Sequence, residues 1–248
     1  MQINGENLFQ NIFLKREDAV RCQNSLLKLR RDLKEEIIIT GSQASSIHLL
    51  ENKLQTKINL NDIDIVVKDL SVFLPQLTND FLIRHFHPTR EKGKILIMLV
   101  DAENKLKICC FTPQTVNVLN RLSDFEFDGL HCKLVSVEDI LAKLLGVIYP
   151  ITRNEAVEEK YYEHFKSLLK IANWDVAKKV WRECRKAQQT LEFEEVFQII
   201  KQKINANPKL LQSFQYSQNI NEKCQWCIKS ELFPIAPLSE IHKILGYV

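Results

Sequence analysis

Two short stretches decide the fold of this chain: Ile37-Ile38-Ile39-Thr40-Gly41-Ser42 and, further along, Asn61-Asp62-Ile63-Asp64-Ile65-Val66-Val67. Both are rich in β-branched residues, which favours β-strands. The first ends at a glycine, and a run without Gly or Pro up to Leu54 follows, so it predicts a strand, a tight turn and a helix. Side chains two positions apart on a strand share a face. We therefore expect Asp62 and Asp64 to point together, with the isoleucines beside them in a core.

These residues suit a metal site next to a phosphate site. Two carboxylates on one face of a strand can share a divalent cation, and Mg²⁺ prefers oxygen ligands. A glycine lets the backbone approach a phosphate closely, and the amides at the start of a helix bind anions. We therefore predict cation binding by Asp62 and Asp64 and phosphate binding by Gly41 and Ser42. The alternative is that the aspartates are two solvated acids at the end of a strand.

The order Gly41-Ser42, helix, Asp62-x-Asp64 resembles the signature of the nucleotidyltransferase superfamily, the fold of DNA polymerase beta. The stretch from Val135 to Leu144 also resembles the segment after the last catalytic-domain strand in bacterial members. The layout is similar to that of abortive-infection type nucleotidyltransferase toxins and their relatives.

This resemblance implies an α+β fold, with a mixed sheet flanked by helices and a C-terminal all-helical domain. It also implies Mg²⁺ or Mn²⁺ at Asp62 and Asp64 and an NTP with its phosphates at Gly41 and Ser42. The nucleotidyl group would pass to an acceptor hydroxyl of RNA, a protein or a small molecule.

The family pattern includes a third carboxylate on a later strand. The matching stretch here is Leu106–Phe111, where Cys109 stands at the expected aspartate. A thiol is a soft, poorly matched ligand for magnesium. The alternative function is therefore a catalytically degenerate protein that binds a nucleotide or a partner. Asp101 or Glu103, in the turn before this stretch, are candidates to supply the missing oxygen.

Apolar runs predict the rest of the sheet. Residues 81–86 read as a strand, and 94–100 with 105–111 read as a hairpin around a polar turn. Residues 130–135 read as a further strand. Ser136 followed by Asp139 indicates a capped helix that continues to Ile148.

The sequence changes near Pro150 from a mixed strand and helix pattern to a purely helical one, which predicts a domain boundary there. We expect a nucleotidyltransferase-like domain over 1–150, with an N-terminal helical segment over 9–36 and the core over 37–150. Residues 151–248 are expected to form a helical domain, since 154–203 is almost free of breakers and rich in Glu, Lys and Leu. A third possibility is an interaction protein whose helical half carries the function.

The composition is that of an ordinary soluble protein, with 45% hydrophobic and 26% charged residues and a net charge of +3. That charge is too small to imply a nucleic-acid partner by itself. We see no basic and apolar leader and no apolar run of membrane-spanning length, and seven cysteines without such a leader favour reduced thiols. The chain is therefore expected to be cytoplasmic.

Three further motifs suggest functions that compete with structural explanations. The segment 166–186 carries lysines and arginines around Trp174 and Trp181, so it could contact RNA or pack as a helical face. Cys224 and Cys227 have the spacing of a zinc knuckle or redox pair, or of a packed helix terminus. Three histidines are also candidates, His85 and His87 as a surface or metal pair and His48 as a substrate contact or a buried structural residue.

Overall fold

The computed structural model of the chain describes residues 9–86, 92–127 and 129–213. The chain divides into two compact units, with the division between Val135 and Ser136. Each unit has its own core, and each is described by itself below.

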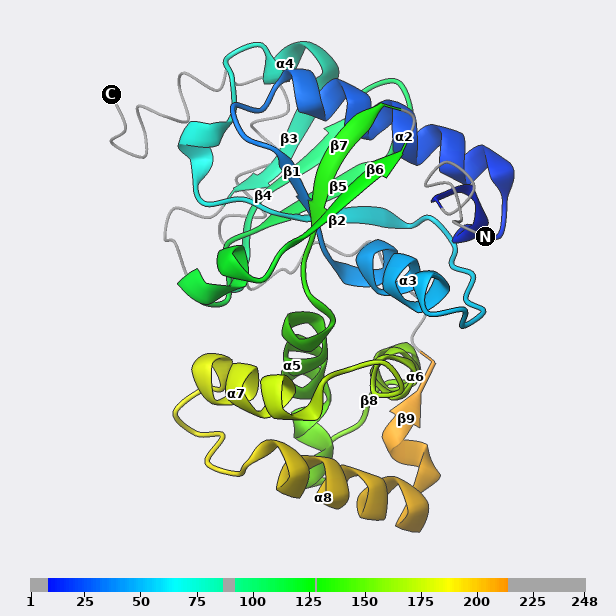
Figure 1. Cartoon of the computed structure of the whole chain (residues 1–248), viewed down its shortest axis with the longest axis vertical. Helices are drawn as coiled ribbons and strands as arrows, with labels where there is room; N and C mark the ends of the chain where they lie inside the picture. The colour runs from blue at the N-terminus through cyan, green and yellow to red at the C-terminus, as the bar shows by residue number, and fades with distance from the viewer. Residues whose placement is uncertain (1–8, 87–91, 128, 214–248) are drawn as a thin grey trace. The chain divides into compact units, whose positions relative to one another are not determined.

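The first unit is built on a mixed seven-stranded sheet (Figure 1). Its strand order is β3-β4-β5-β2-β1-β7-β6. The pairs β2–β5 and β1–β7 are parallel, and the other neighbouring pairs are antiparallel. The strands are β1 (Ile37–Ile39), β2 (Asp62–Val66), β3 (Phe81–Phe86), β4 (Ile95–Asp101), β5 (Lys107–Phe111), β6 (Ser123–Phe127) and β7 (Leu130–Leu134).

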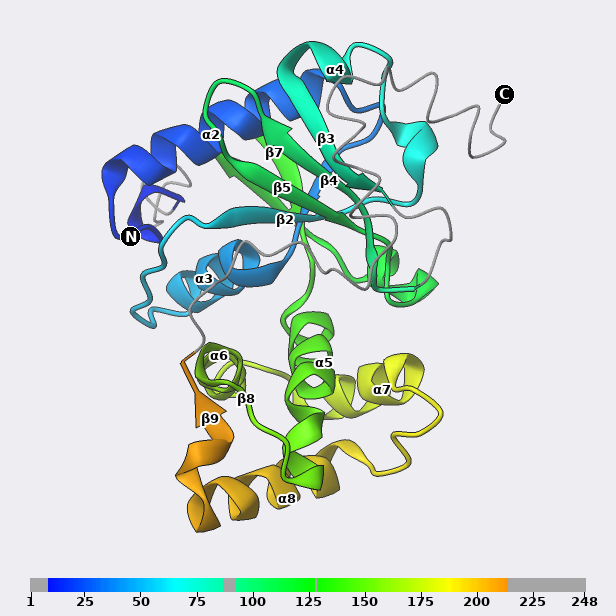
Figure 2. The ribbon, with the colours of Figure 1, turned by 180° about the vertical axis from the view of Figure 1, so that it is seen from behind.

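Helices cover both sides of this sheet. Figures 1 and 2 show α2 (Arg16–Arg31) along one side and α3 (Gly41–Glu51) along the other. The shorter elements are α4 (Leu77–Asp80) and two 3-10 helices, Leu70–Val72 and Val116–Asn120. The predicted mixed sheet flanked by helices is confirmed.

The side of the sheet under α2 is a closed core. Asp101, in β4, accepts hydrogen bonds from Ser25 and Lys28 of α2, so its side chain lies on that side. Leu99 lies two residues before Asp101 and therefore points to the same side of the sheet. Ile108 of β5 is paired with Leu99, and Ile63 of β2 is paired with Ile108, so these side chains also point to that side. These three apolar side chains are completely buried. The opposite face of β2, β4 and β5 carries the half-buried Asp62 and Asp64.

The second unit is helical. It contains α5 (Val137–Ile148), α6 (Glu159–Leu168), α7 (Trp174–Cys184) and α8 (Phe193–Ala206), with two 3-10 helices, Tyr149–Arg153 and Pro208–Leu210. A short parallel pair, β8 (Val157–Glu158) with β9 (Leu211–Gln212), is the exception to the all-helical expectation. Phe165, Trp181 and Phe193 are among its buried core residues.

The division of the chain falls before α5, whereas the sequence pattern placed it after that helix, near Pro150. The reason is packing, because α5 lies against α6, α7 and α8. The predicted cap is present at its start, where the Asp139 backbone N–H donates to Ser136 Oγ at 3.1 Å. The remainder of the expected helical domain, 214–248, lies outside the described residues.

The expected helical segment over 9–36 is shorter and interrupted. Residues 9–11 are helical, and α2 then runs from Arg16 to Arg31. β-bridges on either side of α2 explain why the helix begins and ends where it does. Phe13 forms a β-bridge with Ile58, and Leu33 forms one with Phe73. A backbone that pairs with another strand cannot also continue a helical hydrogen-bond ladder.

Candidate metal centre

Strand β2 places its two aspartates on the half-open face of the sheet. Asp62 and Asp64 are partly buried, and Ile63 and Ile65 on the other face are completely buried. This alternation confirms that the two carboxylates share a face. The apolar residues fix the register of the strand, since a slip by one position would bury both carboxylates.

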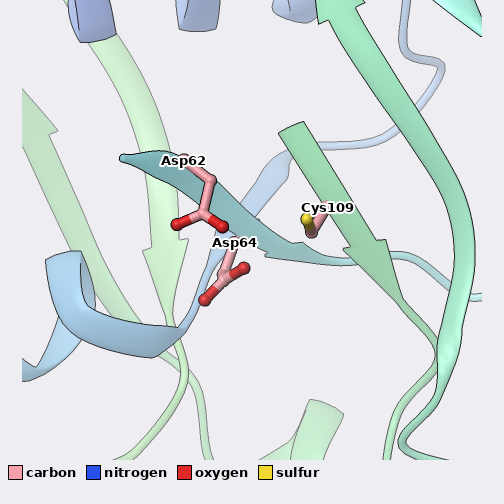
Figure 3. A group of neighbouring side chains, drawn as sticks. All are labelled: Asp62, Asp64 and Cys109. Atoms are coloured by element: carbon pink, nitrogen blue, oxygen red, sulfur yellow. The ribbon is translucent and has the colours of Figure 1, made fainter. Parts of the chain in front are cut away.

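Strand β5 brings a thiol to the same place. In the parallel pairing of β2 with β5, Asp64 lies opposite Cys109 and Asp62 lies opposite Lys107. One ligand atom from each of Asp62, Asp64 and Cys109 lies within 4.8 Å of the others. Figure 3 shows the two carboxylates and the sulfur on the same side of their strands. The structure thus brings together the three residues that the sequence analysis singled out at this site.

Gly41 fits directly against this group. Its φ is +67°, a left-handed conformation that favours glycine. A Cβ at this position would lie 2.2 Å from Asp64 Oδ2, so a side chain here would displace that carboxylate. The Thr40 N–H also donates to the Asp64 carbonyl oxygen at 2.9 Å. Gly41 therefore lets the start of α3 lie beside the carboxylate of Asp64.

The first turn of α3 has no side-chain cap among the described residues, whereas Ser136 caps α5 and Asn173 caps α7. The first backbone amides of a helix have no intrahelical partner, so an anion can accept their hydrogen bonds. Ser42 is in this turn and is half-buried. The predicted phosphate-binding residues, Gly41 and Ser42, therefore lie at an uncapped helix start beside the carboxylates.

Sequence reasoning missed two residues of this site. The Lys107 ammonium forms an ion pair with Asp62, with Nζ 3.2 Å from Oδ2. The side-chain amide of Gln43 donates to the Asp62 carbonyl oxygen at 2.5 Å, which ties α3 to the start of β2. Lys107 could have been found from strand alternation, since it stands two residues before Cys109. No sequence pattern signals the contact of Gln43.

The donor set fits one cation better than two magnesium ions. Asp62 and Asp64 supply carboxylate oxygens, but Cys109, a residue that is only 4% exposed, supplies a sulfur. Cys110 points to the other face, where burial raises the pKa of its thiol, helped by the nearby Cys109 and Asp64. Two acids match the hard ligands of Mg²⁺ or Mn²⁺, whereas the thiol does not match a second hard ion.

Asp101 and Glu103 do not replace the missing third acid. The completely buried carboxylate of Asp101 accepts hydrogen bonds from Ser25, Lys28 and Asn104, on the α2 side of the sheet. Glu103 pairs with Lys28 at 2.6 Å. The expectation that one of them supplies an oxygen to the site is therefore wrong, because both serve to attach α2 to the β4–β5 turn.

The histidines have structural surroundings. His48 is buried, and its Nε2 lies 2.9 Å from the Val135 carbonyl oxygen, with Nδ1 3.5 Å from Glu51. It joins α3 to the end of β7, which agrees with the structural alternative. His85 is buried on β3 rather than exposed at the surface, and His87 lies outside the described residues.

The basic segment 166–186 offers less positive charge than its sequence suggests. Four of its cations have acidic partners within 3.0 Å: Lys166 with Glu163, Lys178 with Glu194, and both Arg182 and Arg185 with Glu192. Trp181 is 1% exposed, so its ring cannot stack on a base. RNA contact at this segment stays a prediction without support from the described contacts.

Two expectations concern other parts of the chain. Cys224 and Cys227, the candidate zinc or redox pair, lie outside the described residues. In the described ranges, no helix combines the length and apolar character needed to cross a membrane.

The chain was compared with protein families, curated proteins and solved structures. No protein-family model matches the chain, and no curated protein matches it. Among solved structures, the chain is similar to an antigenic nucleotidyltransferase-like protein from Paracoccidioides brasiliensis, with a TM-score of 0.37 and 13% identity. The match covers 78% of this chain and 92% of that one.

Proposed function

We propose that this chain is a nucleotidyltransferase-like protein that binds an NTP with one divalent cation and transfers a nucleotidyl group to an acceptor hydroxyl. The new bond joins the acceptor oxygen to the α-phosphorus, pyrophosphate leaves, and the hydroxyl proton passes to solvent. One observation carries the proposal. The carboxylates of Asp62 and Asp64 lie together beside the uncapped start of α3, with Gly41 against Asp64. These residues would place a cation site next to an anion site, as a metal-bound triphosphate requires.

The chain's own residues would position the nucleotide. The amides of the first turn of α3 and the Ser42 hydroxyl would bind phosphate oxygens. Lys107 adds a positive charge on the same face and can reach an anion there. Asp62 and Asp64 would hold the cation, Mg²⁺ or Mn²⁺ in the first instance. When bound, this ion neutralises phosphate charge and polarises the phosphoryl group that is attacked.

Transfer assays test this proposal directly. The chain is incubated with labelled NTPs, Mg²⁺ or Mn²⁺, and candidate acceptors, including RNA, protein and small hydroxyl compounds. Transfer by the wild type should be lost in Asp62→Asn and Asp64→Asn, which keep the side-chain size but remove the charge. Asp124→Asn is the control, because Asp124 has an 89% exposed side chain and lies outside the site. Equal transfer by Asp64→Asn and wild type would refute the proposal.

A second function is favoured by Cys109. A protein with a thiol in place of the third acid could bind the nucleotide and cation without turnover, as a regulatory or partner-binding module. Calorimetry then shows cation-dependent NTP binding that depends on Asp62 and Asp64, while the same preparation transfers nothing to any acceptor. Turnover by the wild type would exclude this second function.

The acceptor in this proposal is a hydroxyl group. RNA, a protein side chain and a small molecule all remain in the same class, since each offers a hydroxyl. Acidic partners of Lys178 and Arg182 argue against segment 166–186 as the main RNA surface. Labelled product from one acceptor class alone would assign it.

A further inference from the structure

Two carboxylates and one thiol lie together at the candidate site, and these donor types determine which metal ion it would prefer. We propose that Asp62, Asp64 and Cys109 together bind one borderline transition-metal ion of the Zn²⁺ type, through two carboxylates and one thiolate, in preference to Mg²⁺. This inference rests on the proposed function in using the same cation site. It differs in naming the sulfur as a ligand and in the class of ion that follows.

The geometry supports a shared ion. The three ligand atoms lie within 4.8 Å of one another. Small side-chain rotations would bring each of them to a metal–ligand distance, about 2.0–2.2 Å for oxygen and about 2.3 Å for sulfur. The parallel register that places Asp64 opposite Cys109 holds the oxygen and sulfur donors on adjacent strands. The backbone therefore presets the ligand pair, and only side chains need to move.

The donor types set the preference. Magnesium takes oxygen ligands and keeps part of its water shell, while thiolates favour softer ions such as Zn²⁺ and Co²⁺. Cys109 is 4% exposed, whereas Asp62 and Asp64 are half-buried, so little water competes for the side chain of Cys109. Its directly opposite neighbour on β4 is Met98, whose thioether is also soft. The environment of Cys109 therefore suits a softer metal ion than Mg²⁺.

The local charge favours one ion over two. Lys107 Nζ lies 3.2 Å from Asp62 Oδ2, so a positive charge already stands on one side of the carboxylate pair. A second divalent cation there would meet that ammonium as well as the first ion. A single ion held by Asp62, Asp64 and Cys109 avoids the repulsion between two divalent cations.

Cobalt absorption is the test, because a thiolate bound to Co²⁺ gives a sulfur-to-metal charge-transfer band in the near ultraviolet that oxygen ligands do not give. The full chain carries Cys224→Ser and Cys227→Ser, which removes the competing cysteine pair seen in the sequence. Titration with Co²⁺ should produce the band, and Zn²⁺ should displace it. Excess Mg²⁺ should not.

Variants in that background assign the ligands. Cys109→Ser should abolish the band and weaken Zn²⁺ binding by more than the about 10–100-fold that loss of an outer-shell partner costs. Cys110→Ala is the matched control, one residue along the same strand and buried on the opposite face, and should keep the band. Cys109→Asp should remove the band and increase Mn²⁺ and Mg²⁺ affinity, because the site becomes one of three oxygens.

The outcomes separate this inference from the proposed function. Cobalt that binds through Asp62 and Asp64 without a sulfur band overturns the inference and leaves the proposed function in place. A band that persists in Cys109→Ser likewise overturns it. A chain whose binding of every tested cation is unchanged by Asp64→Asn overturns both.

Discussion

Gly41 links the backbone of α3 to the chemistry of the site. Its positive φ and its contact with Asp64 Oδ2 are two separate reasons for a glycine. Any larger residue has to adopt a left-handed conformation and also displace the carboxylate. The conformation alone costs an L-residue about 1–2 kcal/mol.

Gly41→Ala is therefore expected to lower stability by about 1–2 kcal/mol and to weaken both cation and NTP binding. Chemical denaturation and calorimetry measure the two effects. Gly146→Ala is the control, because Gly146 lies within α5 and a Cβ there meets nothing within 4 Å. That variant should leave binding unchanged and be neutral or stabilised by about 0.4–1 kcal/mol. Full binding by Gly41→Ala would contradict the position of α3 beside Asp64.

Lys107 is expected to have opposite effects on the binding of the cation and of the NTP. Its ammonium competes with a cation for Asp62, yet it adds attraction for a phosphate on the same face. Lys107→Gln should therefore bind the free cation more tightly and the free NTP less tightly, each by several-fold. Separate titrations of the metal and of the nucleotide measure this crossed effect. A variant that changes both affinities in the same direction would show that Lys107 acts on folding instead.

At the scale of elements, Asp101 attaches α2 to the hairpin of β4 and β5. Burial alone would raise the pKa of its carboxyl, but hydrogen bonds from Asn104, Ser25 and Lys28 outweigh this and lower the pKa to about 2 from the ordinary 3.8. A carboxylate with a lowered pKa in the folded state stabilises the protein above its unfolded pKa. That stabilisation is lost as the pH falls through the folded pKa.

The size of this effect follows from the shift. The difference between the ordinary and the folded pKa corresponds to about 2 kcal/mol of stability at neutral pH. We expect this contribution to decline between pH 3.8 and about pH 2. Urea denaturation at a series of pH values, compared with Asp101→Asn, measures it. The variant should be less stable at pH 7, with the gap narrowing in acid; a gap that is constant with pH would contradict this account.

Elements with a strong local signal could be predicted from the sequence. Residues 81–86, the hairpin and the helix after Ser136 follow from apolar runs and capping chemistry. Strand β6 was missed, although Phe125 and Phe127 are buried and alternate with exposed acids. Its charged residues are typical of a loop, and this segment is a strand because it pairs with β7. Tertiary pairing of this kind is absent from local patterns.

The candidate site, too, could be predicted from the sequence only where local rules apply. Alternation on one strand is a local rule, so the common face of Asp62 and Asp64 could be predicted from sequence. The neighbours on other strands could not, because register is set by packing across the sheet. Lys107 lies beside Asp62, and Asp101 lies on the opposite face, only because of how β2, β5 and β4 pair.

At the scale of the whole molecule, the chain has two cores, and the candidate cation site belongs to the first. The second core is centred on residues such as Trp181, whose indole N–H donates to the Leu191 carbonyl oxygen at 3.0 Å. Trp174 is 38% exposed and packs on Phe193 and Phe197. The two tryptophans therefore have different structural roles within one segment.

We expect Trp181→Ala to destabilise the second unit by about 3–5 kcal/mol, as loss of a large core residue does, and Trp174→Ala to cost less. Because the candidate ligands lie in the first unit, cation binding should persist in Trp181→Ala at temperatures where the helical signal of α5 to α8 is lost and that of α2 and α3 remains. Circular dichroism and metal titration on the same samples measure this. Simultaneous loss of both signals would contradict two separate cores.

The central claim is that Asp62 and Asp64 bind a nucleotide through a cation. Calorimetric titration of the full chain with a non-hydrolysable NTP analogue, with and without Mn²⁺, tests it most directly. The account predicts cation-dependent binding by the wild type and by Asp124→Asn, and none by the double variant Asp62→Asn/Asp64→Asn. Cation-dependent binding of equal affinity in the double variant would contradict it.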